Sequence, residues 1–155
     1  THQRETFALL DARDRPVRPG ILWLDERARP QVAALSARLG GDMLRAITGK
    51  PPDPTPALYA LAWLGEHEPE ALSRTARVVD VHAFLIGRLT GRAVTSTASA
   101  DPLGLLDMAA LDWSDALLAE VGLGRAQLLD QLQHLDGVVL EADRRHAVPA
   151  TFNVG

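Results

Sequence analysis

The sequence contains no cysteine, and this absence excludes several kinds of chemistry. A chain without thiols forms no disulfide, offers no thiolate to a metal and has no cysteine nucleophile. The absence also favours a reducing compartment, so we expect a cytoplasmic protein. Aromatic residues are scarce as well, at 5%. Any aromatic surface for a ligand must therefore come from very few side chains.

Long apolar runs and a one-sided basic charge are also missing. No apolar stretch reaches the length that crosses a bilayer, and the first residues do not have the pattern of a signal peptide. The formal net charge is -4, and arginines alternate with Asp and Glu throughout. Because a nucleic-acid backbone requires a basic stripe, we expect neither a nucleic-acid partner nor a membrane partner.

The sequence motifs that cradle phosphate or hold a metal are absent too. Neither common glycine-rich phosphate loop occurs, and no serine lies in a nucleophile elbow. The five histidines are scattered, with no pair at metal-ligand spacing. His82, on an apolar stretch, is better explained as a core residue with a hydrogen-bond partner. We therefore expect no metal site and no catalytic residue within this chain.

What is present is the composition of an ordinary globular domain. The chain has 155 residues, of which 46% are hydrophobic and 23% charged. This length fits a single domain with a real core. The sequence opens on THQRETF without a methionine, so we expect the chain to be part of a longer protein.

Two short strands are predicted near the start, within an α/β fold that is otherwise helix-rich. Residues 5–10 indicate a strand that ends in a polar turn at 11–14, and the apolar run 21–24 indicates a second. The two would pair as a hairpin. Two isolated strands are marginal in water, so they favour a larger sheet with other strands.

Helical spacing of apolar residues dominates the rest of the chain. The first helix has Pro30 in its first turn and stops at Gly40-Gly41. Prolines stiffen a loop over 47–56, and leucines pack a turn over 103–108. Further helices are predicted over 58–64, from Pro69, from Val81 to Leu89, from Ser114 as N-cap, and over 123–135; a strand is predicted over 138–140.

The most informative polar run is Gln3-Arg4-Glu5. An amide, a guanidinium and a carboxylate offer hydrogen-bond donors and acceptors together, which suits the hydroxyls of a polyol. The alternative is a solvated strand end with a surface ion pair of little energetic consequence. Residue types alone favour the alternative.

Trp23 and Asp25 follow in the second predicted strand. A tryptophan can lay its apolar face on sugar C–H groups, although on its own Trp23 is better explained as a core residue. Asp25 either hydrogen-bonds a hydroxyl at a strand end or caps the coming helix. Trp63 and Trp113 lie among leucines at helical spacing, and both are predicted to be core.

The string HQRETFALLDARDRPVRPGILWLDERA resembles the substrate-site strand pair of the FGGY carbohydrate kinases. Glycerol kinases carry a similar Gln-Arg-Glu-Thr, and xylulokinases a similar Arg-Pro-x-Ile-Leu-Trp-x-Asp. The blocks ITGKPPDP, LAWLGEHEPEAL, RVVDVHAFLIGRLTGR and LLDMAALDWSDALLAEVGL continue the resemblance in the family's order. It covers about residues 2–130.

The resemblance implies an actin-like, ribonuclease H-like fold of two domains with a cleft between them. The sugar or polyol would bind the first domain, and ATP with Mg²⁺ the second, for transfer of the γ-phosphoryl group to a hydroxyl. Arg4 and Glu5 match the pair that hydrogen-bonds the polyol, and Trp23 matches the aromatic that packs on its carbon chain. Asp25 matches an acidic position of xylulokinase-like members.

Three positions depart from the glycerol kinase pattern and put glycerol specificity in doubt. Thr55 stands where those enzymes place a substrate-contacting tyrosine, Ala60 where the signature has a lysine, and Ala57 where it has a small hydroxyl or a proline. The family's Asp-x-Gly-Thr strand is expected before residue 1, and its Gly-Gly-Asp stretch with the catalytic base after residue 155.

The resemblance therefore predicts that residues 1–155 are a partial sugar-binding domain of a xylulokinase-like enzyme, inactive alone. The alternatives are a glycerol- or erythritol-type polyol kinase, a non-catalytic relic that binds sugar or protein, and a helical bundle without a ligand. A homodimer is left open.

Overall fold

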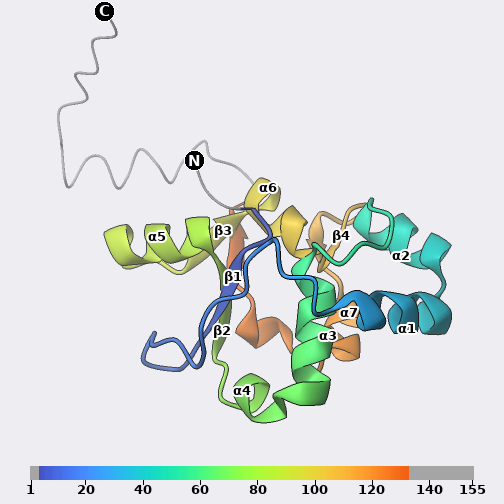
Figure 1. Ribbon diagram of the computed structural model, residues 1–155. Helices are drawn as coiled ribbons and strands as arrows, with labels where there is room; N and C mark the ends of the chain where they lie inside the picture. Colours follow the sequence, from blue (N-terminus) through green and yellow to red (C-terminus); the bar gives the residue numbers. More distant parts are fainter. Residues whose placement is uncertain (1–3, 133–155) are drawn as a thin grey trace, which may run out of the picture.

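The computed structural model describes residues 4–132, and a short antiparallel sheet lies at its centre. Strand β1 (Phe7–Leu10) pairs with β2 (Arg77–Asp80), with Phe7 opposite Asp80. Successive side chains of a strand point to opposite faces. Phe7 and Leu9 accordingly join the main core, whereas Leu10 joins a smaller cluster with Val79. The sheet is thus covered on both faces, by α5 on one side and by the α1–α3 group on the other (Figure 1).

The predicted strand over 21–24 is wrong, and the expected hairpin is reduced to two isolated antiparallel bridges, Leu10 with Pro16 and Phe7 with Ile21. Within the run 21–24 only Ile21 pairs with β1: the Ile21 N–H donates to the Phe7 carbonyl at 2.9 Å, and the Phe7 N–H donates to the Ile21 carbonyl at 3.1 Å. Beyond it, Leu22 and Leu24 are 55% and 65% exposed. An extension of this pairing beyond Ile21 would place residues 22–24 opposite residues 4–6, where Glu5 has a φ of +62° within a turn, so the ladder stops at Ile21.

Two separate helices form where one was predicted. Helix α1 (Arg29–Leu39) has Pro30 in its first turn and ends at Gly40, whose φ is +86°. Helix α2 (Gly41–Thr48) starts directly afterwards. The glycine pair therefore turns the chain, as predicted, but the periodic Leu44 belongs to the second helix. The proline loop and the next two helices are confirmed, as α3 (Ala57–His67) and α4 (Pro69–Ser73).

The predicted helix from Val81 is confirmed as α5 (Val81–Thr90). Asp80 begins it: its Oδ1 accepts the Ala83 N–H at 2.8 Å, and its Oδ2 accepts the Thr95 hydroxyl at 3.2 Å. The side chain is nearly fully buried, so these bonds satisfy a carboxylate that burial would otherwise destabilise. The helix ends at Gly91, with a φ of +71°.

Short elements complete the described chain. Ser114 is the N-cap of α7, as predicted, and accepts the Leu117 N–H at 3.4 Å. The leucines of the predicted turn at 103–108 are buried as well. The elements are β3 (Val94–Ser96), α6 (Thr97–Ala100), η1 (Asp101–Leu103), β4 (Leu106–Asp107), β5 (Asp112–Trp113), α7 (Asp115–Glu120), η2 (Arg125–Gln127) and β6 (Asp130–Leu132).

The predicted helix over 123–135 is wrong across its described part. The chain instead makes the 3-10 turn η2 and then β6, which pairs in parallel with β3. Gly124, within the predicted helix, is extended instead, with a φ of −112° and a ψ of 162°. The Trp113 indole N–H also donates to the Leu129 carbonyl at 3.0 Å and engages the extended backbone there. The predicted strand at 138–140 lies outside the described residues.

The three remaining core predictions have different outcomes. Trp113 is buried, as predicted. Trp63 is only partly buried and packs at the edge of the main core. His82 is partly buried too, and its Nδ1 lies 3.1 Å from the Ser99 hydroxyl, so it has a polar contact but is not a core residue.

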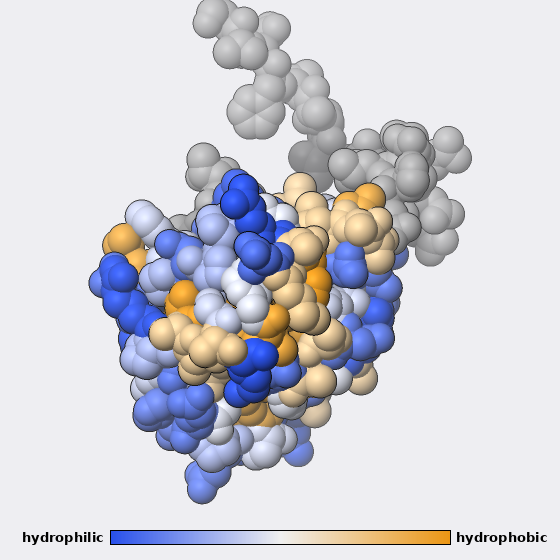
Figure 2. Space-filling view, turned by 90° about the vertical axis from the view of Figure 1, so that its right-hand side faces the viewer, coloured by the Kyte–Doolittle hydropathy of each residue, from blue (hydrophilic) through white to orange (hydrophobic). Residues whose placement is uncertain are grey.

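The surface carries both apolar and polar residues. Figure 2 views the side on which α1 and α2 lie, where apolar residues gather across the middle and hydrophilic ones surround them. Met43 on α2 is among the exposed large apolar side chains. Within residues 4–132, no helix is both long and apolar enough to span a membrane.

Gly104 provides a test of the packing between η1 and the proline loop. Its φ is +70°, and an added Cβ would lie 2.8 Å from the Cβ of Pro56. Gly122 is the matched control, with a φ of +69° and nothing within 4 Å. Backbone strain alone should lower the free energy of unfolding of Gly122→Ala by about 1–3 kcal/mol. In Gly104→Ala the clash adds to the strain, so its free energy of unfolding should fall further. Urea unfolding would measure both; equal losses would contradict the close packing.

Asp11 provides a test of the turn after β1. Its carboxylate accepts the N–H groups of Arg13 and Arg15 at 2.8 and 3.0 Å, and it pairs with the Arg15 guanidinium at 2.8 Å. The backbone and side-chain hydrogen bonds of Arg15 lower the pKa of Asp11 to about 2. A lowered pKa means that the turn's contribution to stability is full above pH 4 and is lost as pH falls through about 2. A carboxyl ¹³C titration would check this, with Arg15→Gln expected to raise the pKa; equal values in both proteins would refute it.

Candidate functional site

The predicted site residues lie on two segments that meet at the start of β1. Arg4 and Glu5 precede the strand, while Trp23 and Asp25 follow the bridge between Ile21 and Phe7. The Thr6 hydroxyl accepts the Trp23 N–H at 3.2 Å and links the segments a second time. The structure therefore brings the Arg4-Glu5 pair and Trp23 to the same end of the sheet.

Arg4 and Glu5 form a turn, and the strand begins at Phe7, which corrects the prediction of a strand that starts at residue 5. Glu5 has a φ of +62°, a left-handed conformation that costs a non-glycine residue about 1–3 kcal/mol. The Glu5 side chain is partly buried, whereas Arg4 is exposed. Gln3 lies outside the described residues.

Asp101 on η1 stands beside Arg4. Its Oδ2 lies 3.7 Å from the Arg4 guanidinium, and its Oδ1 pairs with the Lys50 ammonium. Sequence reasoning missed both Lys50 and Asp101, because they lie far from Arg4 in the chain and neither belongs to a motif. The cluster draws the proline loop and η1 toward the turn that holds Glu5.

Trp23 is exposed, which corrects the interpretation that it is a core residue. Its exposed fraction is 46%, although its backbone N–H is fixed by Thr6. An indole in this position has an apolar surface turned to solvent on an anchored backbone. Such a surface can pack against the C–H groups of a carbohydrate.

Asp25 does not cap the following helix, so that alternative is wrong. The N-cap of α1 is Ala28, and no side chain caps it. The Asp25 carboxylate instead accepts the Arg27 backbone N–H at 3.0 Å and the Arg27 guanidinium at 2.7–2.9 Å. These Arg27 hydrogen bonds hold the pKa of Asp25 below its ordinary value.

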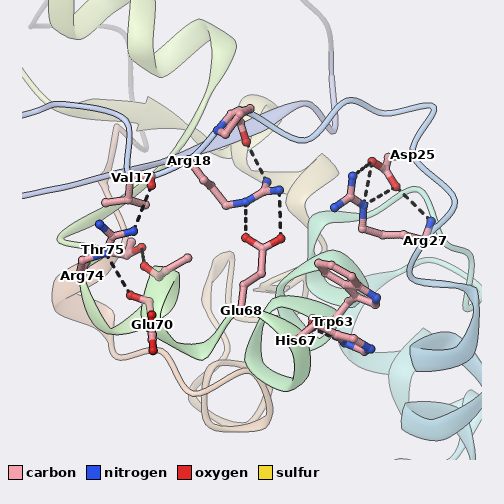
Figure 3. A network of polar contacts seen from close by, with 12 residues as sticks. Val17, Arg18, Asp25, Arg27, Trp63, His67, Glu68, Glu70, Arg74 and Thr75 are labelled. Atoms are coloured by element: carbon pink, nitrogen blue, oxygen red, sulfur yellow. Dashed lines mark hydrogen bonds and ion pairs between the residues drawn. The ribbon is translucent and has the colours of Figure 1, made fainter.

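Arg27 also lies over the ring of Trp63, at 4.8 Å from the ring centroid (Figure 3). His67 stacks on Trp63 with the two centroids 4.4 Å apart and the planes 5° from parallel. Sequence reasoning missed Arg27 and predicted Trp63 as a purely core residue. The spacing of Trp63 and His67 by one helical turn was a usable signal for the stack.

An ion pair also joins the segment before α1 to the corner between α3 and α4. Arg18 donates to both oxygens of Glu68, at 2.7 and 3.3 Å, next to the Arg27 column in Figure 3. The Arg18 side chain is only 14% exposed. The segment that carries Trp23 and Asp25 is thereby connected to the α3–α4 corner on both sides of the site residues.

Together these groups offer an exposed aromatic surface, a guanidinium and carboxylates near one end of the sheet. The nearby cations Arg4 and Lys50 are matched by Glu5 and Asp101, so the charges balance. Such a surface suits an uncharged polyhydroxy molecule. Within the described chain, no group of three or more His, Asp or Glu side chains could hold a metal ion, so no residue is assigned to Mg²⁺.

Comparison with known proteins finds carbohydrate kinases among the similar sequences. The chain is 37% identical over 127 residues to a xylulose kinase of Streptomyces rubiginosus, covering 81% of this chain and 26% of the relative. A glycerol kinase of Methylorubrum extorquens is 36% identical over 138 residues, covering 83% of the chain and 28% of the relative. The chain therefore spans about a quarter of the length of the curated relatives that it matches.

The solved structures similar to the chain are sugar kinases. A xyloylose kinase from Brucella ovis superposes with a TM-score of 0.78 at 34% identity, over 84% of this chain and 26% of the other. A gluconate kinase from Lactobacillus acidophilus gives 0.80 at 28% identity, over 84% and 27%. The predicted fold class, a helix-rich α/β part of an actin-like sugar kinase with few strands, is thus confirmed.

The family itself is also established. A model described as the N-terminal domain of the FGGY family of carbohydrate kinases matches residues 1–152. The chain belongs to this family, as its sequence blocks predicted.

The link between Thr6 and Trp23 can be tested directly. Thr6→Val removes the hydroxyl that accepts the Trp23 N–H, and a lost hydrogen bond of about 1 kcal/mol should speed amide hydrogen exchange at Trp23 roughly fivefold. Thr6→Ser keeps a hydroxyl and should exchange like the unmodified chain. Unchanged exchange in Thr6→Val would show that this bond does not hold the Trp23 segment.

Proposed function

We propose that this chain is the acceptor-binding part of an ATP-dependent carbohydrate kinase of the xylulokinase type. The observation that carries the proposal is the exposed Trp23, anchored through Thr6 beside the Arg4-Glu5 turn in an FGGY family domain. The geometry supplies an apolar surface and polar groups at one end of a sheet, which is what a sugar requires.

Each of these residues has a proposed role. Arg4 donates hydrogen bonds to acceptor hydroxyl oxygens, and Glu5 accepts hydrogen bonds from hydroxyl groups. Trp23 packs on the carbon chain of the acceptor. Asp25 keeps lone pairs for a further hydroxyl, because its carboxylate is 20% exposed even though Arg27 binds it.

The reaction proposed for the whole protein moves the γ-phosphoryl group of ATP to an acceptor hydroxyl. A new oxygen–phosphorus bond forms, the bond to the β-phosphate oxygen breaks, and ADP leaves. The hydroxyl proton passes to a carboxylate base. Base, ATP and Mg²⁺ are assigned to regions beyond this chain, where Mg²⁺ would neutralise charge on the transferred group.

A neutral ketose such as a pentulose is the proposed acceptor. The balanced charges around Arg4 support an uncharged molecule, and xylulose kinases are among the similar proteins. Thr55 adds a reason against glycerol: its hydroxyl and backbone N–H both bind Asp53, so it does not replace a substrate-contacting tyrosine. Ala57 and Ala60 are buried in α3 and present no polar group.

Two alternatives remain as outcomes of the same test. A glycerol- or erythritol-type kinase is favoured by the similarity to glycerol kinases. A non-catalytic relic would bind sugar without transferring phosphate. A panel of pentuloses, glycerol, erythritol and gluconate, offered with ATP and Mg²⁺ to the full-length protein, separates the three.

Arg4→Ala and Glu5→Gln should each raise the KM for the accepted sugar in the full-length protein. Hydrogen bonds to charged groups contribute about 1.5–3 kcal/mol, so the expected increase is roughly 10- to 100-fold. The KM for ATP should stay the same, because neither residue is assigned to the nucleotide. A coupled assay of ADP release would measure both constants.

Arg13→Ala is the matched control, since Arg13 is an exposed arginine in the turn after β1; its KM values should not change. The 155-residue chain alone should release no ADP. Equal acceptor KM values in Arg4→Ala and the unmodified enzyme would remove Arg4 from the site, and a full-length protein that phosphorylates nothing in the panel would overturn the proposed function.

A further inference from the structure

The proposed acceptor residue Asp25 is oriented by a neighbour that sequence reasoning did not find. Arg27 lies two residues further along the chain and contacts both carboxylate oxygens, with Nε at 2.8 Å from Oδ1 and 2.9 Å from Oδ2. The backbone N–H of Arg27 adds a third donor to Oδ1. The direction in which Asp25 presents its free lone pairs therefore depends on where Arg27 lies.

An arginine in an exposed segment has alternative acidic partners, and here the neighbouring ones are occupied. Glu26 pairs with Arg29 at 2.6 Å. The hydrogen bonds to Asp25 are the main cause of the raised pKa of Arg27, and the charge of nearby Glu68 adds to it. Arg18, however, takes both oxygens of Glu68. With these carboxylates paired elsewhere, Asp25 is the partner left to Arg27.

The remaining freedom of the Arg27 side chain is restricted by Trp63. The guanidinium carbon lies 4.8 Å from the indole centroid, within the range of a cation–π contact. His67 covers the other face of the ring in a near-parallel stack, and its Nδ1 lies 3.0 Å from the Trp63 carbonyl. Figure 3 shows the three side chains as one column beside Asp25.

We propose that Trp63 is a positioning residue of the acceptor site: its indole, supported by His67, holds Arg27 against Asp25 and so fixes the direction of the Asp25 carboxylate. This inference rests on the proposed function, because it assigns Trp63 to the role of Asp25 in binding the acceptor. This role is separate from the packing of Trp63 at the edge of the main core.

The first test measures the Asp25–Arg27 pairing without any sugar. The titration of the Asp25 carboxyl would be followed by ¹³C NMR in the 155-residue chain. Arg27→Gln should raise the pKa of Asp25 part of the way to its ordinary value, because it removes the guanidinium hydrogen bonds that are the largest cause of the lowering and keeps the backbone one. Trp63→Leu should raise the pKa part of the way, and Trp63→Phe, which keeps an aromatic face, should raise it less.

Three results would overturn the inference. In the first, Arg27→Gln changes the pKa of Asp25 but Trp63→Leu leaves it as in the unmodified chain. In the second, neither variant changes the pKa of Asp25. Circular dichroism would show whether Trp63→Leu folds; if it does not, His67→Ala removes only the support of the ring and should give a smaller shift in the same direction. No shift in a folded His67→Ala would likewise contradict the column.

The second test uses the full-length protein and its best acceptor. Trp63→Leu should raise the acceptor KM roughly two- to fivefold, the range of one exposed cation–π contact, and leave kcat and the KM for ATP unchanged. In an Asp25→Asn background the same substitution should add nothing. An added increase there would show that Trp63 does not act through Asp25. If the protein phosphorylates no acceptor, the proposed function fails, whereas the titration still decides whether Trp63 positions Asp25.

Discussion

Hydrogen bonding on both edges of β1 is the constraint on which the rest of the described chain depends. One edge pairs with β2, which lies about 70 residues later in the chain. The other edge binds Val17 and Ile21: the Val17 N–H donates to the Leu9 carbonyl at 2.9 Å, and Ile21 exchanges two bonds with Phe7. Both faces of the strand are also buried. Its register therefore fixes the positions of the segments that continue from β2 and from Ile21.

The candidate site is a direct result of this register. The turn at Arg4 and Glu5 lies directly before Phe7, the residue of β1 that pairs with Ile21. The residues after Ile21 therefore lie beside this turn. The groups of the candidate site are therefore placed by apolar burial elsewhere in the strand and not by contacts among themselves.

Elements with a local cause were predictable from the sequence, and elements with a distant cause were not. Pro30, Asp80, Ser114 and Gly91 mark helix ends through their own backbone chemistry, and α1, α5 and α7 begin or end where these residues indicate. The runs at 21–24 and 123–132 were misassigned, because their conformation depends on the turn at Glu5 opposite the first run and on the distant indole of Trp113 beside the second.

The candidate site shows the same division. Arg4, Glu5, Trp23 and Asp25 came from the family resemblance, while their physical neighbours Lys50, Asp101, Arg27 and Trp63 emerged only with the structure. Pairings such as Asp101 with Arg4 cross about 100 residues and leave no periodic or motif signal.

The attachment of residues 18–27 to the α3–α4 corner has an entropic consequence. Arg18 forms an ion pair with Glu68 at one end of this segment, and the Arg27 guanidinium stacks on the Trp63 ring at the other end. A surface segment that must order itself on binding loses about 0.5–1.5 kcal/mol of affinity for each side chain that becomes fixed. Residues 18–27 are already ordered by these two contacts in the folded chain. A ligand that binds there therefore needs little further ordering of the backbone.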